Sequence, residues 1–468
     1  MKKGEIYEEV VSDYEFPNKG IVVMDDYKIT VKNVLPGQKI RFRVVKKRNN
    51  KYSGQLLELL DSSDIETECA FCNNYGKCGS CLYQTLSYDK QAELKKELVL
   101  SLIDKVCTDY IFDGIVRSPL IYGYRNKMEY TFGDEVKGGP LTLGLHKRGS
   151  FYDILDAGCC RLVHDDYGLI LRTVRDYCTD NNLPYYHRIS HEGFMRHLLI
   201  RRASKTGELL IDIVTSSAIK HDFAGLVQQL LALPLDGSIK GILHTSNDNV
   251  ADTITDQGTD ILYGQDYFYE ELLGLKFRIS PFSFFQTNSY GAEKLYETAR
   301  SYIKDYIDGK VIYDLYSGTG TIAQLLAPVA KKVIGVEIIP EAVDAARMNA
   351  KLNGLTNCEF ITGDVMKTLE SIPETPELIV LDPPREGVHP KALSQILSYG
   401  VDNILYISCK PTSLVKDLEV MLEKGYKLTH VSVVDMFPWT AHVETVVLLS
   451  KGEVDSKKIR VEFSLEDM

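Results

Sequence analysis

The chain has 468 residues and a formal net charge of −11, from 54 Lys and Arg against 65 Asp and Glu. Hydrophobic residues make up 44% and charged residues 25% of the sequence, which excludes a disordered, collagenous or low-complexity protein. No apolar run approaches the ~18 residues of a membrane-spanning helix. The N-terminus, MKKGEIYEEVV, turns acidic before any hydrophobic stretch, unlike a signal peptide. The sequence therefore predicts a soluble, cytoplasmic protein with no membrane partner and no evident obligate protein partner.

Residues 1–60 predict a small β module. Apolar and polar residues alternate in GIVVMDDYKITVKNV, a Pro36-Gly37 turn follows, and IRFRVV and YSGQLLELL predict further strands. Several short strands separated by turns within about sixty residues are typical of a small barrel. Residues 41–51 (RFRVVKKRNNK) add six basic residues and no acidic one, which is a local positive patch in an acidic chain.

A cysteine cluster follows this module directly. Cys69, Cys72, Cys78 and Cys81 fall within thirteen residues, whereas most of the other six cysteines are widely spaced. In an intracellular chain such a cluster more often holds a metal than disulfides. The spacing C-x2-C-x5-C-x2-C suits tetrahedral zinc, and thiolates suit iron–sulfur clusters equally well.

A central α+β domain is expected over residues 61–280. Apolar residues at helical spacing predict a helix from about Asp89 to Val106. Residues 120–280 are rich in strand-like runs punctuated by glycine, and their topology does not follow from the pattern. Two basic stretches lie in this region, residues 122–127 (YGYRNK) and residues 187–205.

From about Gly309 the pattern changes. Apolar strand-like runs such as KVIYDLY and KKVIGVEI alternate with helical stretches such as PEAVDAARMNAKLNG. This alternation predicts a parallel, doubly wound sheet with its ligand site at the carboxyl ends of the strands. We therefore expect an α/β domain over residues 281–450, followed by a mostly charged tail over residues 451–468.

Acidic residues end successive strands of this domain. The first strand runs into DLYSGTGT, whose glycines let the backbone approach a ligand, and Glu337, Asp364 and Asp382 end the next three strands. A carboxylate in such a position accepts hydrogen bonds from ribose hydroxyls. Because no phosphate-loop lysine accompanies the glycines, the pattern favours a nucleoside without phosphate, such as S-adenosylmethionine (SAM). The alternative is a set of solvated capping carboxylates.

A thiol, Cys409, ends the next strand at the same edge. An isolated buried cysteine is usually a small hydrophobe, but a thiol at this edge can act as a nucleophile if Arg385 or Lys410 stabilises the thiolate. Thiolate attack on C6 of uracil makes C5 able to accept a methyl group, and a base must then remove the C5 proton. Glu444, 35 residues downstream, is the best candidate base, although an ordinary surface glutamate has the same spacing.

Six motifs then occur in a recognisable order: FSFFQTN, DLYSGTGT, VIGVE, DPPR, SCKP and FPWTAHVE. They resemble the motif set of the RNA 5-methyluridine methyltransferases, and the resemblance covers essentially the whole chain except the tail. It implies a multidomain α/β protein with a TRAM-type, OB-like barrel at the N-terminus and a Rossmann-like class I SAM methyltransferase domain at the C-terminus. It also implies a SAM-dependent RNA (uracil-5-)-methyltransferase activity.

The resemblance assigns roles to individual residues. Cys409 matches the nucleophile and Glu444 the base. Phe284 matches an aromatic residue near the target base, where it can stack on a flipped uracil, and Arg125 belongs to a stretch suited to substrate contact. The SAM-binding positions of the family match Gln286, Tyr316, Glu337, Asp364 and Asp382.

The cysteine cluster and the substrate also gain an interpretation. The resemblance implies a [4Fe-4S] cluster bound by Cys72, Cys78, Cys81 and Cys160, with Cys160 favoured over Cys159. Cys69 departs from that pattern and leaves zinc open. The cluster favours 23S ribosomal RNA over the alternative substrate, transfer RNA, and the basic stretches are then phosphate contacts. A rival interpretation is a non-catalytic RNA-binding protein with a metal cluster and a retained methyltransferase fold.

Overall fold

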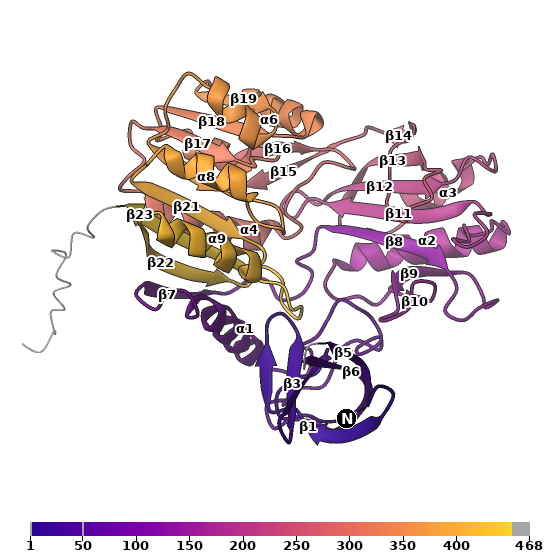
Figure 1. Cartoon of the computed structure of the whole chain (residues 1–468). Coiled ribbons are helices and arrows are strands. Elements are labelled where there is room, and N and C mark those ends of the chain that lie inside the picture. The colour runs from indigo at the N-terminus through magenta and orange to yellow at the C-terminus, as the bar shows by residue number, and fades with distance from the viewer. Residues whose placement is uncertain (1, 49–50, 452–468) are drawn as a thin grey trace, which may run out of the picture.

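The computed structural model describes residues 2–48 and 51–451, and the strands within these ranges form four sheets (Figure 1). A small N-terminal lobe lies at the bottom of Figure 1, below two larger lobes built on a seven-stranded and an eight-stranded sheet. Of the tail expected over residues 451–468, all but Lys451 lies outside the described residues, as do Asn49 and Asn50 of the first basic stretch.

The N-terminal sheet has the strand order β1-β5-β6-β4-β3-β2 and curls around a small apolar core. Its core follows from the alternation in the sequence, since Ile29 and Val31 of β4 are buried between more exposed neighbours. Gly54 allows close packing, because a Cβ there would lie 2.7 Å from the Phe42 ring. The strands are β1 (Ile6–Val10), β2 (Asp13–Glu15), β3 (Lys19–Met24), β4 (Tyr27–Lys32), β5 (Lys39–Arg48) and β6 (Lys51–Asp61).

The cysteine segment that follows has turns and bends, and it leads into α1 (Tyr88–Ile103). The observed helix lies within one turn of the predicted one. Ser87 caps its N-terminus by accepting a hydrogen bond from the Lys90 backbone N–H at 3.3 Å. Lys95 on this helix is almost completely buried.

The central sheet has the order β10-β9-β8-β11-β12-β13-β14, and α2 and α3 pack against it. All of its pairs are antiparallel except β12 with β13, which are parallel and are joined through α3. The elements are β8 (Lys127–Gly133), β9 (Thr142–His146), β10 (Ile154–Asp156), α2 (Asp165–Asp180), β11 (Met195–Arg202), β12 (Glu208–Thr215), α3 (Ala224–Leu231), β13 (Ser238–Ser246) and β14 (Thr259–Gly264).

The C-terminal sheet has the order β19-β18-β17-β20-β21-β23-β22-β7. The five strands from β19 to β21 are parallel, as the alternation of strands and helices predicted. Because β23 is antiparallel to them, the sheet is mixed rather than entirely parallel. Its helical partners are α4 (Ser289–Ile303), α5 (Thr321–Leu326), α6 (Pro340–Leu352), α7 (Val365–Thr368), the 3-10 turn η1 (Leu369–Ser371), α8 (Pro390–Ser398) and α9 (Pro411–Glu423). Its strands are β17 (Val311–Leu315), β18 (Lys332–Glu337), β19 (Cys358–Thr362), β20 (Leu378–Leu381), β21 (Asn403–Ser408), β22 (Tyr426–Val434) and β23 (Glu444–Lys451).

Two connections join the lobes. β7 (Ile111–Val116) precedes the central sheet in the chain but pairs with β22 at the edge of the C-terminal sheet. A hairpin of β15 (Phe268–Leu272) and β16 (Leu275–Ile279) leads from the central sheet to α4. Within residues 2–48 and 51–451, none of the helices combines the length and the apolar composition needed to span a bilayer.

The core strands of the C-terminal sheet are apolar along their whole length because both of their faces are covered. In β20 all four residues, Leu378–Leu381, are buried. One apolar layer lies between the sheet and α4, α5 and α6, and a second lies between the sheet and α1, α8 and α9. A strand buried on both faces needs such a continuous hydrophobic run. The polar residues therefore collect at the strand ends, where the candidate site lies.

Candidate active site

The glycine loop after β17 determines the position of Glu337. The backbone is left-handed at Tyr316, Gly318 and Gly320. A Cβ at Gly320 would lie 2.5 Å from the Phe360 ring, so a larger residue does not fit there. Glu337, at the end of β18, accepts a hydrogen bond from the Gly318 backbone N–H at 3.0 Å. Its carboxylate is therefore held against a stretch of open backbone, as the sequence predicted for a ribose contact.

Asp364 and Asp382 lie farther along the same edge of the sheet. Asp364 follows β19 and caps α7, accepting a hydrogen bond from the Met366 backbone N–H at 2.9 Å. Burial, and then the charge of Asp364, raise the pKa of Tyr316 to about 12. Asp382 follows β20, and burial raises its pKa to about 7. The strand-end residues predicted from the sequence thus line one edge.

Tyr296, a buried residue of α4, marks the point where several of these residues converge. Burial and the charge of Asp382 raise the pKa of the Tyr296 hydroxyl, while a hydrogen bond with Gln286 lowers it. The charges of Glu444 and Asp314 also act on this hydroxyl. The sequence did not predict a role for Tyr296, because its spacing in the helix is that of an ordinary core residue.

Strand register brings Cys409 and Glu444 together. β21 and β23 are antiparallel neighbours, and Ser408 pairs with Thr445. The next position in this antiparallel register places Cys409, just after β21, beside Glu444 at the start of β23. Glu444 is 5% exposed, so it is not the surface glutamate that the spacing alone allowed.

The thiol of Cys409 has the carboxyl groups of Glu444 and Asp382 and the guanidinium of Arg385 as neighbours. The pKa of Cys409 is raised to about 11, mainly by burial. The charges of Glu444 and Asp382 contribute to this increase, whereas the charge of Arg385 lowers the pKa. The Lys410 side chain is exposed, and its backbone N–H donates to the Ser408 hydroxyl at 3.2 Å. Of the two cations considered from the sequence, Arg385 is therefore the one beside the thiol.

The carboxyl groups at this edge form an acidic cluster. Burial, and then the charge of Asp382, raise the pKa of Glu444 well above its ordinary value, and Arg385 opposes this shift. Burial and the charge of Asp382 also raise the pKa of Asp314 to about 8. Asp314 opens the DLYSGTGT motif, so its position was visible in the sequence although no role was assigned to it. Carboxyl groups whose pKa is raised by burial and by neighbouring charges are suited to proton transfer.

Phe284 and Arg125 line a pocket of about 550 Å³. Phe284 is 66% exposed, and a Cβ at Gly318 would lie 4.0 Å from its ring, so the aromatic side chain stands next to the glycine loop. Thr440 and His442, from the connection between β22 and β23, line the same pocket. The pocket thus combines an exposed aromatic ring with polar and cationic side chains, as a nucleotide site requires.

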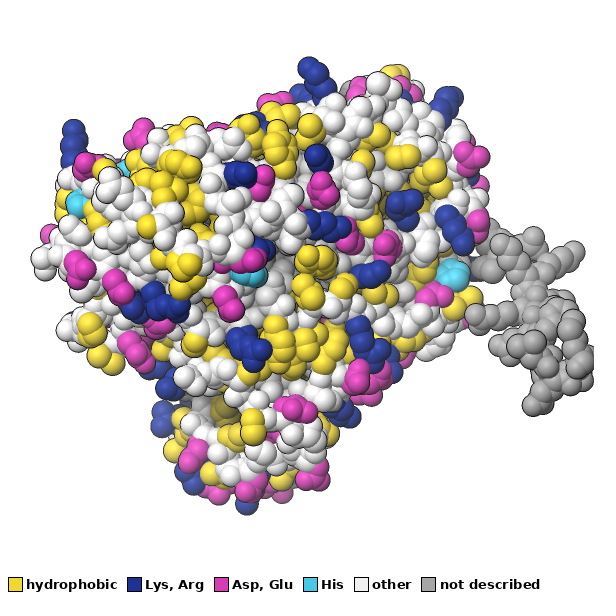
Figure 2. Space-filling model, turned by 180° about the vertical axis from the view of Figure 1, so that it is seen from behind, with side chains coloured by type: hydrophobic (Ala, Val, Ile, Leu, Met, Phe, Trp, Pro, Cys, Tyr) yellow, Lys and Arg dark blue, Asp and Glu magenta, His cyan; other side chains and the backbone are white. Residues whose placement is uncertain are grey.

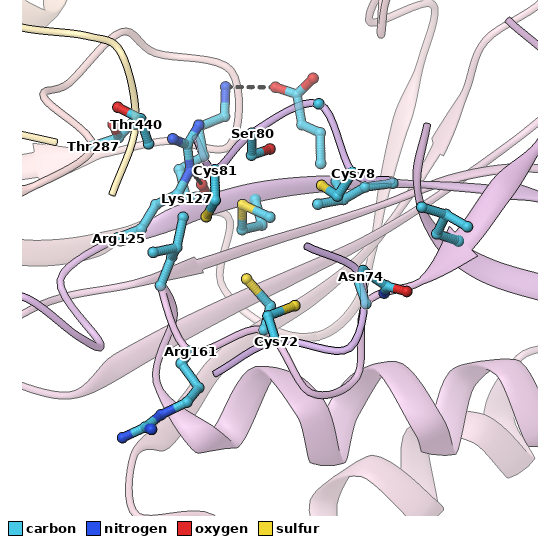
Figure 3. A pocket seen from close by; sticks show the side chains of 18 of the residues that line it. Cys72, Asn74, Cys78, Ser80, Cys81, Arg125, Lys127, Arg161, Thr287 and Thr440 are labelled. Carbon is cyan, nitrogen blue, oxygen red and sulfur yellow. Dashed lines mark hydrogen bonds and ion pairs between the residues drawn. The ribbon is translucent and has the colours of Figure 1, made fainter. Parts of the chain in front are cut away.

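Cysteines line the other part of this pocket. They come from two segments far apart in the sequence: Cys72, Cys78, Cys81, Cys159 and Cys160. In Figure 3 the sulfur atoms of Cys72, Cys78 and Cys81 point toward a common space. Cys69 is exposed and lies outside the pocket lining. Among the described residues, no three His, Cys, Asp or Glu side chains are grouped closely enough to hold a metal ion.

Comparison with known proteins identifies the family. Residues 249–452 match the family model described as tRNA (uracil-5-)-methyltransferase. An uncharacterized RNA methyltransferase of Caldanaerobacter subterraneus is 46% identical over 97% of this chain and 100% of that protein. One from Clostridium tetani is also 46% identical, over 97% of this chain and 99% of the relative. The chain belongs to the SAM-dependent RNA 5-methyluridine methyltransferase family.

A solved structure shows the same fold. The tRNA (uracil-54, C5)-methyltransferase of Pyrococcus abyssi, in complex with S-adenosyl-L-homocysteine, aligns with a TM-score of 0.73 and 24% identity over 95% of this chain and 100% of that chain. This likeness supports the α/β fold of the RNA 5-methyluridine methyltransferase described here. The matching family model and the RNA methyltransferase relatives, rather than this likeness, make the chain an enzyme of the RNA (uracil-5-)-methyltransferase class.

In this 5-methyluridine methyltransferase the sequence-predicted residues form two groups. One group lies around the Tyr296 hydroxyl and the thiol, and comprises Gln286, Asp382, Cys409 and Glu444. The other lies along the glycine loop, and comprises Phe284, Tyr316, Glu337 and Asp364. Arg125 comes from the central lobe, where its Nε donates to the Lys127 carbonyl at 3.0 Å, and it lines the same pocket as Phe284 of the second group.

Proposed function

We propose that the protein methylates C5 of a uridine in RNA with SAM, using Cys409 as the nucleophile and Glu444 as the base. The single observation that carries this proposal is the pairing of the Cys409 thiol with the buried Glu444 carboxyl across β21 and β23. A retained fold without catalysis would have no need to keep a thiol, two carboxyls and a guanidinium together. This pairing therefore argues against the non-catalytic interpretation.

The residues divide the chemistry between them. The Cys409 thiol loses its proton to solvent, its sulfur forms a bond to C6 of uracil, and the electron pair of the C5–C6 double bond moves toward O4, which makes C5 nucleophilic. When bound, SAM would supply the methyl group to C5 and leave as S-adenosylhomocysteine. The Glu444 carboxylate then removes the C5 proton, the double bond re-forms and the C6–S bond breaks, which regenerates the Cys409 thiolate. Arg385 opposes the effect of Glu444 and Asp382 on the thiol pKa and so favours the thiolate.

The proposed SAM site comprises five residues: Gln286, Tyr316, Glu337, Asp364 and Asp382. The groups at this site fit a nucleoside. Carboxylates and glycine backbone lie at the strand ends, whereas a phosphate group would need cations there. We assign Glu337 to the ribose hydroxyls, since its carboxylate is already held beside Gly318. Asp382, which lies near both the thiol and Tyr296, belongs to the part of the site nearest the reacting methyl group.

We propose that the RNA is held by three parts of the chain. Phe284 stacks on the flipped uracil, and Arg125 contacts the adjoining backbone within the pocket that they share. Residues 1–60, with their six curled strands and basic β5, would serve as a TRAM-type, OB-like RNA-binding domain. Residues 281–450 would form the methyltransferase domain and residues 61–280 the central domain with the cysteines, except that α1 and β7 pack on the C-terminal sheet.

A [4Fe-4S] cluster is proposed on Cys72, Cys78, Cys81 and Cys160. The convergence of these thiols from two distant segments supports it. Zinc is the alternative. The zinc interpretation depended on the spacing of all four clustered cysteines, and it is weakened because Cys69 lies outside the pocket lining. The group would have a structural or RNA-positioning role, since methyl transfer needs no electrons.

The proposed substrate is 23S ribosomal RNA in the cytoplasm, on the basis of the cysteine pocket. Transfer RNA is the alternative, because the matching family model and the Pyrococcus abyssi enzyme are both described by that substrate. The test is to map 5-methyluridine in both RNAs from cells with and without the protein. We expect the modification to disappear from ribosomal RNA. Its loss from transfer RNA alone would replace the proposed substrate, and its persistence in both would contradict the proposed function.

A further inference from the structure

The connection between β22 and β23, residues 435–443, is held in place by Trp439. This residue is the only tryptophan of the chain, and it is 4% exposed. Its backbone has a φ of 68°, in the left-handed region that bulky residues rarely adopt. Such a conformation persists only where the surroundings over-determine it, and it is concentrated at functional sites.

Hydrogen bonds from three separate segments hold Trp439. Its backbone N–H donates to Gln91 Oε1 on α1 at 2.7 Å. Its carbonyl accepts from the backbone N–H groups of Leu82 at 2.8 Å and Tyr83 at 3.2 Å. Its indole Nε1–H donates to the Ile121 carbonyl at 2.6 Å. Every polar group of this residue is thus bound to a partner outside the connection that contains it.

The indole ring also contacts the cysteine segments. It stacks on Tyr122 at 5.5 Å between ring centres and meets the edge of Phe71 at 5.3 Å. Phe71 immediately precedes Cys72, and Leu82, which bonds the Trp439 carbonyl, immediately follows Cys81. The Arg161 guanidinium, one residue after Cys160, lies 4.3 Å from the centre of the Tyr122 ring. The first cysteine segment therefore contacts the indole directly, and the second reaches it through the Tyr122 ring.

The start of the connection is anchored independently of the cysteines. Asp435 forms a completely buried ion pair with Lys95 at 2.7 Å, and Lys95 Nζ also donates to the Phe437 carbonyl at 3.0 Å. Asn288 donates to the Met436 carbonyl at 2.7 Å. Trp439 therefore links the cysteine segments to the second half of the connection, which presents His442 to the pocket and leads into Glu444.

We propose that Trp439 is a positioning residue that couples the conformation of the cysteine segments to the placement of His442 and Glu444. This role rests on the proposed function, in which Glu444 takes part in turnover. It gives the cysteine segments an effect on turnover in addition to the RNA-positioning role proposed above. Since the proposed RNA contacts are Phe284, Arg125 and the N-terminal lobe, a disturbed Trp439 slows the step that uses Glu444 more than it weakens RNA binding, which it can affect only through Ile121 and Tyr122.

The kinetic test uses Trp439→Phe, which keeps an aromatic ring and the backbone bonds but loses the bond from the indole nitrogen. We expect kcat to fall about tenfold, since small displacements of a catalytic group cost rates of this order, while KM for RNA stays within twofold. Trapping by 5-fluorouridine RNA, which needs Cys409 rather than Glu444, should keep its wild-type rate. An unchanged kcat, or equal losses in trapping and turnover, would overturn the inference.

A second set of three variants tests the coupling from the cysteine side and keeps Trp439 as the reporter. Phe71→Leu removes the edge contact, Phe71→Tyr retains it, and Asn73→Ala changes an exposed side chain of the same segment. Because Trp439 is the only tryptophan, emission excited at the indole band reports this one position. We expect Phe71→Leu to shift the emission to longer wavelength, increase acrylamide quenching and lower kcat, with wild-type behaviour in the other two variants.

The outcomes separate this inference from the proposed function. If Phe71→Leu shifts the emission without lowering kcat, the contact exists but carries no coupling, and the inference fails. If neither changes, it also fails. If the wild-type protein forms no 5-methyluridine in any RNA, the proposed function fails on its own, because the fluorescence comparison of the three variants needs no activity.

Discussion

The protein contains two thiol sites that share a burial effect but differ in their neighbours. Burial raises the pKa of Cys409 to about 11, of Cys160 to about 11 and of Cys81 to about 12. At Cys409 the other charges are the carboxylates of Glu444 and Asp382 and the opposing Arg385. At Cys81 they are the thiols of other cysteines.

The difference indicates two uses of the same side chain. A thiol beside a carboxyl and a guanidinium can exchange one proton and attack carbon, which suits covalent catalysis. A group of thiols beside one another becomes ionised together only when a metal replaces the protons, which suits a cluster. The predictions below test this division, from the largest expected effect to the smallest.

Removing the nucleophile should have the largest effect. We expect Cys409→Ala to reduce 5-methyluridine formation by about four orders of magnitude or more, as for other covalent nucleophiles. The same variant should form no covalent adduct with 5-fluorouridine RNA on a denaturing gel. Cys107→Ala, which removes a thiol distant from both sites, is the matched control and should behave like the wild type. A trapped adduct in Cys409→Ala would assign the attack to another residue.

Removing the base should arrest the reaction at a later step. We expect Glu444→Gln to slow turnover by about 10²–10⁴-fold, the usual contribution of a general base. Because the C5 proton then stays in place, methylated RNA should remain attached to Cys409. Mass spectrometry of the trapped species would detect this adduct, with Glu423→Gln, an exposed change on α9, as the control. Recovery of free, unmethylated RNA would remove Glu444 from the base role.

The thiol pKa predicts a dependence on pH. Because the pKa of Cys409 lies near 11, the thiolate fraction rises with pH throughout the neutral range, and trapping by 5-fluorouridine RNA should accelerate between about pH 7 and pH 9. Removing the cation with Arg385→Gln should raise the thiol pKa further and slow trapping about tenfold per pKa unit. Arg385→Lys should retain most of the rate. A flat pH profile in the wild type would show that another step limits trapping.

Replacing Cys160, a proposed ligand of the cluster, should remove the bound metal, whereas replacing Cys69 should not. We expect Cys160→Ser to lose bound iron and sulfide and the brown colour of an anaerobic preparation, while Cys69→Ser, outside the pocket, keeps them. Metal and sulfide analysis of the two proteins gives the result directly. A colourless wild-type protein with stoichiometric zinc that depends on Cys69 would replace the cluster by a zinc site.

The sequence predicted the strand ends of the C-terminal sheet because these strands carry a strong signal. Buried parallel strands are continuous apolar runs, so the polar residue that ends each run, such as Glu337 or Asp382, stands out and meets its neighbours at one edge. Cys409 was found in the same way. Its contact with Glu444 depends on an antiparallel register, which the sequence supported only through resemblance to a family.

Other features left no local signal. Tyr296 has the spacing of a core residue, and only packing brings its hydroxyl to Gln286 and Asp382. The strand-rich character of the central domain was predicted but the topology of its sheet was not, because one parallel pair is inserted among antiparallel ones through α3. Trp439 was visible within FPWTAHVE, but its partners on α1 and in the cysteine segment are far away in the sequence. Such contacts depend on long-range packing rather than on local pattern.

The position of β7 has a consequence for how the chain reaches its final form. β7 closes the edge of the C-terminal sheet, and Asp113 within it lies 2.9 Å from His430, a residue 317 positions later. Contacts of such separation form late and slowly during folding. During synthesis β7 leaves the ribosome long before its partner strand β22, so the two strands can pair only late. A fragment starting at residue 281 would expose the edge of β22, and a bare edge of that kind invites intermolecular pairing.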